Sequence, residues 1–244
     1  MLNLYKPLFL NFMVQMSKMR FLYILFVGFS VFSQEKLPDF TFIKVDSLYR
    51  EDQFYFSITY NRLRKTPENF TQNGLSTGFN LGFLRDMPFN KKRTFALALG
   101  LGISYNKYHQ NLKVSENGAT YIYEVVNDAE FSKNKLEQVF VDIPMELRWR
   151  NATPESHKFW RVYSGFKFRY LVFDKIKHVG TSEITITNNR DFNKLQFGPY
   201  LSFGFNTWNF HIYYGLNPIF SSAKTSTEKI ESKTLNIGLI FYIL

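Results

Sequence analysis

The sequence has no cysteine, only three tryptophans, and no long apolar run after its N-terminal part. The lack of cysteine excludes disulfide frameworks, thiolate metal sites and cysteine nucleophiles. A membrane-spanning helix needs about 20 consecutive apolar residues, and no stretch after Ser33 reaches that length. The chain beyond Ser33 therefore either folds in water or crosses a membrane as strands.

The N-terminal part has the features of a cleaved export signal. Lys18 and Arg20 precede an apolar run over residues 21–32, and Ser33 stands before the polar Gln34. A run of this length is short for a spanning helix and typical of a secretory signal. An uncleaved N-terminal anchor is the alternative.

We therefore predict three parts of the chain. Residues 1–33 form a signal peptide, with translation beginning at Met16 or Met19. Residues 34–52 form a periplasmic N-terminal segment, and residues 53–244 form the folded domain. The chain is thus expected to be exported.

The charge of the chain is strongly positive but scattered. Thirty Lys and Arg against 20 Asp and Glu give +10. Removing residues 1–33 takes away three bases and no acids, which leaves 27 − 20 = +7. Nucleic-acid binding needs a clustered basic stripe or a reading motif, and neither is present. We predict no nucleic-acid partner.

What the sequence has in abundance is alternation of apolar and small or polar residues. Aromatic residues make up 19% of the chain. Within residues 95–106, Leu97, Leu99 and Leu101 alternate with Ala98 and Gly100. Successive side chains of a strand point to opposite faces, so this period of two predicts a strand with one bulky apolar face. Eight segments share the pattern: 54–61, 75–83, 95–106, 138–150, 160–172, 195–206, 210–217 and 234–243.

The connections between these segments alternate in length. Short turns on one side and long loops on the other are typical of outer-membrane barrels, with the short turns in the periplasm. In one long connection, Asn117-Gly118 predicts a two-residue hairpin turn. The short turns are expected at 87–93, 151–158 and 206–209, and the longer, more polar loops at 62–73, 107–134, 174–193 and 218–232.

The fold predicted from these patterns is all-β, an eight-stranded antiparallel transmembrane β-barrel. A soluble lipocalin-like barrel is the rival, but its lumen would have to hold the bulky residues. With the bulky face toward lipid, the opposite face becomes the lumen, where charges pair with one another. The predicted lumen ion-pair cluster consists of Asp142, Glu146, Arg148, Arg161, Lys167 and Arg169, and the predicted interfacial aromatics at the short-turn end are Trp149, Trp160 and Trp208.

We predict no catalytic, cofactor-binding or metal-binding residues. No two of the four histidines have metal-ligand spacing. The string GLSTG at residues 74–78 matches a nucleophile elbow, but a strand continues through it where a helix would be needed. A lumen filled with Arg, Lys, Tyr and Gln is expected to be closed to solutes, which argues against a diffusion pore.

Six strings of the sequence are distinctive: VDSLYREDQFY (45–55), GFLRDMP (82–88), IPMELRWR (143–150), KFWRVYSG (158–165), YYGLNP (213–218) and GLIFYIL (238–244). Together they resemble the PorT family of outer-membrane β-barrels. The resemblance runs over nearly the whole chain after residue 33. It implies an accessory, non-enzymatic protein of the type IX secretion system and of gliding motility.

The function expected from all of this is a structural or assembly component of a secretion or gliding apparatus in the outer membrane. The expected partners are outer-membrane lipids, the barrel-assembly machinery reading the C-terminal strand at 235–244, and other secretion proteins. Two alternatives stay open: a lipid-A-modifying enzyme, since some small barrels modify lipids, and a surface adhesion or stability barrel.

Overall fold

The computed structural model describes residues 52–90, 92–118, 120–151 and 160–243. The predicted signal peptide and residues 34–51 of the predicted periplasmic segment lie outside the described residues. No helix in the described part is long and apolar enough to cross a membrane.

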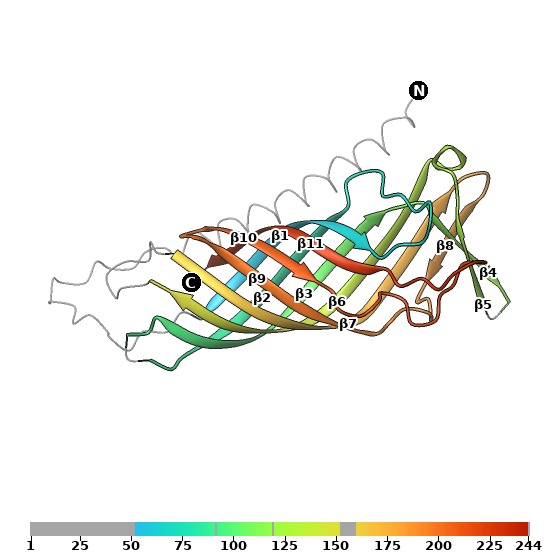
Figure 1. Ribbon diagram of the computed structural model, residues 1–244. Helices are drawn as coiled ribbons and strands as arrows, with labels where there is room; N and C mark the ends of the chain where they lie inside the picture. The colour runs from blue at the N-terminus through green and yellow to red at the C-terminus, as the bar shows by residue number, and fades with distance from the viewer. Residues whose placement is uncertain (1–51, 91, 119, 152–159, 244) are drawn as a thin grey trace, which may run out of the picture. The chain divides into compact units, whose positions relative to one another are not determined.

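Eight strands form one closed antiparallel sheet, which confirms the predicted barrel (Figure 1). Each barrel strand pairs with the next one along the chain, and the first strand pairs with the last. The barrel strands are β1 (Gln53–Arg64), β2 (Thr77–Pro88), β3 (Phe95–His109), β6 (Lys133–Arg150), β7 (Trp160–Val179), β9 (Leu195–Phe205), β10 (Trp208–Tyr214) and β11 (Lys233–Ile243).

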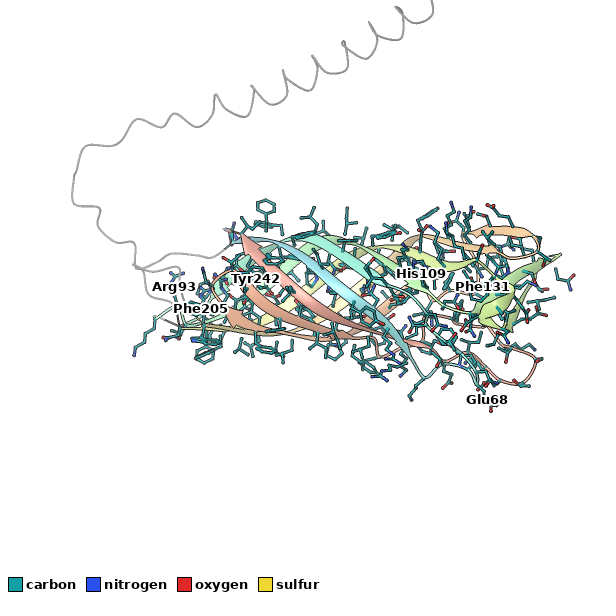
Figure 2. All side chains as sticks on the ribbon, turned by 90° about the horizontal axis from the view of Figure 1, so that it is seen from above. Glu68, Arg93, His109, Phe131, Phe205 and Tyr242 are labelled. Atoms are coloured by element: carbon teal, nitrogen blue, oxygen red, sulfur yellow. The ribbon has the colours of Figure 1, made fainter. Side chains whose placement is uncertain are left out.

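The connections alternate between short and long, as predicted. Residues 89–94 and 206–207 join strands at one end, where β6 also ends at Arg150 and β7 begins at Trp160. Apart from Asn151, the turn predicted at 151–158 lies outside the described residues. Residues 65–76, 110–132, 180–194 and 215–232 join strands at the other end. Figure 2 shows Arg93 and Phe205 at the first end, and Glu68 and Phe131 at the second. By the rule for outer-membrane barrels, the first end faces the periplasm.

The largest difference from the predicted strands is the length of β6 and β7. Their pairing continues to Lys133 and Val179, well beyond the predicted limits. The register shifts at one point: Val139 pairs with Phe173, but Phe140 pairs with Leu171. Val172 is therefore an extra residue, a β-bulge. Beyond it the alternation of β7 reverses, which is why a search for an unbroken period of two stops at residue 172.

The two faces of the barrel have the predicted polarity. Leu101, in the middle of β3, exposes 62% of its surface on the outside, whereas Asn61, Ser104 and Asn106 are buried inside. The lumen is tight enough to require glycine. A Cβ atom on Gly102 would lie 2.2 Å from the hydroxyl of Tyr55. Large side chains thus face outward because the interior has no room for them.

The long loops are more apolar than predicted. They carry a hairpin, β4 (Leu112–Asn117) and β5 (Thr120–Val125), and the strand β8 (Glu183–Thr187), which extends the edge of β7 (Figure 1). The hairpin was predicted, but Asn117 pairs with Thr120, so the turn begins at Gly118. We call the apolar core beneath these loops the cap core: Leu63, Tyr108, Leu112, Val114, Tyr123, Leu136, Phe140, Leu171, Ile176, Ile186, Phe192, Ile219, Phe220, Ala223 and Ile230.

Candidate functional site

The lumen near the short-turn end holds a buried carboxylate between two arginines. Asp86 of β2 accepts hydrogen bonds from Nη1 of Arg148 at 2.9 Å and from Nη2 of Arg150 at 2.8 Å. All three side chains have no exposed surface. Arg148 also donates from Nε to Glu146 at 2.7 Å. One acid thus ties β2 to two successive inward positions of β6.

Glu146 continues this network toward the opposite wall. Its Oε1 accepts a hydrogen bond from the hydroxyl of Tyr200 at 2.9 Å and from that of Tyr242 at 3.4 Å. Arg148 lies 4.9 Å from the ring centre of Tyr163. Tyr242, labelled near the short-turn end in Figure 2, is buried. The charged groups are therefore surrounded by tyrosines, whose hydroxyls donate to the carboxylate and whose ring faces attract the arginine.

A second ion-pair group lies one level closer to the loops. Asp142 lies 3.3 Å from Nε of Arg169 and 3.8 Å from Nζ of Lys167. Arg169 also donates to the hydroxyl of Ser104 at 2.9 Å and lies over the ring of Phe140 at 4.2 Å. Asp142, Lys167 and Arg169 thus act as one network across β6 and β7.

All six members of the predicted lumen cluster are buried, but they form more than one group. Arg161 lies apart, where it donates to the backbone carbonyl of Asn206 and lies 6.0 Å from the ring centre of Tyr242. Sequence reasoning missed Asp86 and Arg150, although the signal was present. Asp86 is in phase with the inward residues of β2, and Arg150 stands two residues after Arg148.

The three predicted interfacial tryptophans all face outward at the short-turn ends of strands. Trp149 pairs with Phe95 and with Val162 across neighbouring strands. Trp160 and Trp208 both pair with Phe205. All three rings are exposed. They therefore form a partial belt on one side of the barrel, in the place where membrane-interface aromatics are expected.

The lumen contains very little free space. The cavity between Tyr55, Glu146, Lys167 and Tyr200 has a volume of about 10 Å³, room for about one water molecule. We therefore expect the purified protein in a planar lipid bilayer to give no steady ion conductance. A large porin measured in the same bilayer is the positive control. A reproducible open conductance would contradict the closed lumen.

A serine and a histidine also meet in the lumen, an arrangement that the sequence did not predict. The hydroxyl of Ser202 on β9 lies 2.9 Å from Nδ1 of His211 on β10. Both residues are buried, and the adjacent cavity, which His211 helps to line, is the one of about 10 Å³. A lipid substrate has no room there, so the pair links two strands by a hydrogen bond.

A larger hollow lies among the loops, and we call it the loop groove. It has a volume of about 730 Å³ between residues 67–69, the segment 121–130 that includes most of β5, and residues 224–228. Among the described strands β5 pairs only with β4, which leaves its other edge without a strand partner, and residues 121–125 of β5 line the groove. Glu68, Glu124, Glu130 and Glu228 line it with a single lysine, Lys224.

Within the described residues, no group of three or more His, Asp and Glu side chains is placed to hold a metal ion. The described residues form an ion-paired lumen that carries a folded set of loops with an acidic groove.

Comparison with curated proteins gives no match. The fold is similar to a crystal structure of Ail, the attachment invasion locus protein of Yersinia pestis, at 12% identity and a TM-score of 0.36, covering 80% of this chain and 100% of that one. A structure of Ail with the heparin analogue sucrose octasulfate gives 14% identity and a TM-score of 0.33, covering 78% and 99%.

The family comparison rests on the sequence itself and covers most of the chain. The family model for the outer membrane protein beta-barrel domain matches residues 32–221. These residues include seven of the eight barrel strands, from β1 to β10. The chain therefore belongs to the outer membrane protein β-barrel domain family and is an outer-membrane β-barrel protein.

Proposed function

We propose that this barrel is a non-enzymatic accessory component of a protein secretion or gliding apparatus, and that its folded loops are the face that contacts another protein. The observation that carries the proposal is the cap core. It holds the long loops in one shape above a lumen that is closed by ion pairs.

The energetics of the loops support a role in recognition. Fixing the backbone of each residue costs roughly 1–2 kcal/mol, and a membrane barrel does not need ordered loops to stay closed. Here apolar side chains offset that cost. Tyr123 packs against Phe220 with ring centres 5.4 Å apart, and its hydroxyl donates to Asp191 at 2.9 Å. A rigid surface loses less entropy on binding than a flexible one.

The setting in type IX secretion or gliding is supported by the strings at the turns that resemble the PorT family. Strand patterns are shared by many barrels, but strings that run out of a strand into a connection, such as YYGLNP at residues 213–218, are less constrained by the alternation of the strands. Outer-membrane lipids, the barrel-assembly machinery acting on β11, and secretion proteins contacting the loops are the partners that this role requires.

Deleting the gene is expected to stop secretion or gliding, with the cargo retained inside the outer membrane. Secreted proteins would be measured in culture fluid and in the periplasm. Complementation with Tyr123→Ala/Phe220→Ala should give an inserted barrel that restores little secretion, because the cap core is disrupted. Normal secretion by the deletion strain would reject the proposed role.

The same strains distinguish the enzymatic alternative. Ser202→Ala/His211→Ala removes the serine–histidine pair from the lumen, and on our proposal it restores secretion fully. Masses of lipid A would be compared between the deletion strain and the complemented strain. A mass difference that this double substitution abolishes would favour a lipid-modifying enzyme.

A surface adhesion barrel is the second candidate, and the loop groove favours it. Four glutamates line the groove together with residues of β5. This arrangement suits an extended basic segment that adds to β5 by main-chain hydrogen bonds. For this function, cells carrying Glu68→Gln/Glu124→Gln would lose binding to the surface ligand while secreting normally. A secretion defect in that variant would favour the accessory role.

A further inference from the structure

Five lysines occupy outward positions at the loop ends of three adjacent strands, and we call them the lysine patch. They are Lys107 on β3, Lys133 and Lys135 on β6, and Lys175 and Lys177 on β7. The residues between them, such as Tyr108, Leu136 and Ile176, are buried, so the five lysines share the outer face.

The pairing of the strands brings these lysines together. Lys135 lies directly opposite Lys177 across β6 and β7. Lys107 and Lys175 lie on either side of Glu137, from β3 and from β7. Like charges directly opposite one another in a sheet are destabilising unless something neutralises them. The arrangement therefore favours an anionic ligand.

The acids of this face neutralise only part of the charge. Glu137 pairs with Lys135, and Glu183 on β8 pairs with Lys177. Lys107, Lys133 and Lys175 form no ion pair within 4 Å among the described residues. A hydrogen bond from Lys177 and its charge lower the pKa of the exposed Glu183 carboxyl, and Lys133 and Lys175 lower it further. The field over the patch is thus positive.

The patch lies where the apolar band ends. On β6 the outward side chains from Trp149 to Val139 are apolar, and the next three are Glu137, Lys135 and Lys133. Ten steps of about 3.3 Å along a strand tilted by about 40° rise roughly 25 Å, the height of the apolar band of an outer-membrane barrel. The ammonium groups therefore lie at headgroup level on the loop side.

We propose that the lysine patch binds the phosphate groups of a phosphorylated lipid headgroup, of the lipid A class, in the leaflet that faces the loops. Lysine suits this role because its flexible stem runs along apolar surface while its ammonium group reaches a phosphate oxygen. Clustered lysines beside an apolar band are the usual means of attracting anionic headgroups. The inference concerns the outer wall of the barrel and does not depend on the proposed function.

The test uses the purified barrel in detergent, with bisphosphorylated lipid A, dephosphorylated lipid A and inorganic phosphate as probes. Binding would be measured by native mass spectrometry and by the shift in unfolding temperature. The test variant is Lys107→Gln/Lys133→Gln/Lys175→Gln. The control, Lys92→Gln/Lys224→Gln/Lys229→Gln, loses the same charge from exposed sites outside the patch.

We expect the wild type and the control to bind bisphosphorylated lipid A equally. The patch variant should bind about a hundredfold more weakly, since each lysine contributes about a factor of five. Dephosphorylated lipid A should bind weakly to all three proteins. Equal binding of the two lipids, or wild-type affinity in a folded patch variant, would overturn the proposal. Binding of inorganic phosphate as tight as that of the lipid would overturn its lipid specificity.

Because the charge change could affect insertion, the single variant Lys133→Gln provides a second measurement. Lys133 is the most exposed position of the patch and forms no ion pair among the described residues, so the fold is expected to tolerate the change. We expect about fivefold weaker binding of bisphosphorylated lipid A. Unchanged affinity in this variant would count against the patch as the site.

Discussion

Replacing Asp86 by asparagine is expected to lower the free energy of unfolding of the barrel by about 3–5 kcal/mol. The carboxylate lies within 2.9 Å of Arg148 and 2.8 Å of Arg150, and none of the three side chains is exposed. Asparagine removes the negative charge that both buried arginines contact, whereas Arg148 keeps its bond to Glu146. The measurement is reversible unfolding by guanidinium in lipid vesicles.

The control for Asp86→Asn is Glu124→Gln, which also turns a carboxylate into an amide. Glu124 is 55% exposed and lies 3.7 Å from Lys113. An exposed pair of this kind contributes about 0–1 kcal/mol. The double variant Asp86→Asn/Arg150→Met should recover part of the loss, because it removes one of the two positive charges that Asp86 neutralises. A loss below 1 kcal/mol for Asp86→Asn alone would show that the lumen is hydrated rather than packed.

Replacing Leu101 by arginine is expected to cost about 2–4 kcal/mol of unfolding free energy in a lipid bilayer. Leu101 lies on the outer face in the middle of β3 and is 62% exposed. In a protein that folds in water, arginine at so exposed a position would be nearly neutral. The large cost arises because the side chain faces hydrocarbon at mid-depth. Unfolding in vesicles and the yield of inserted barrel both measure it.

Depth distinguishes this effect from a general intolerance of arginine. Leu75→Arg makes the same change at a site that is 69% exposed, just before β2 on the loop side. Near the interface the cost falls to about 0–1 kcal/mol. Equal stability of the two variants would argue that the outer face does not lie in a membrane.

The barrel was predictable because each strand is indicated by the alternation of residues within its own segment of the sequence. In β3, six apolar residues stand at every second position, and this pattern predicts both the strand and which of its faces points outward. The closed lumen followed from volume, since bulky residues could lie only outside. The loop-side limit of β7 was not predictable. The extra residue Val172 reverses the alternation of inward and outward side chains, and a valine does not by itself indicate a bulge.

The cap core was not predictable for a different reason. Phe192, Phe220 and Ile230 stand in connections without any period, and they meet only after the strands have placed the loops side by side. The Asp86–Arg148–Arg150 group was predictable only in part. Each residue has the right phase for the lumen, but their pairing depends on the registers of β2, β3 and β6, which the sequence does not state.

The pairing of β1 with β11 affects how the barrel assembles. Tyr55 meets Tyr242 and Thr59 meets Gly238, so the seam joins the first and the last strand of the barrel. Until that row of hydrogen bonds forms, both strands present open edges, which invite association with other chains. Pairing of β1 with β11 therefore completes the barrel. An assembly intermediate that lacks this pairing would be a curved, open sheet, and the edges of both strands would need protection.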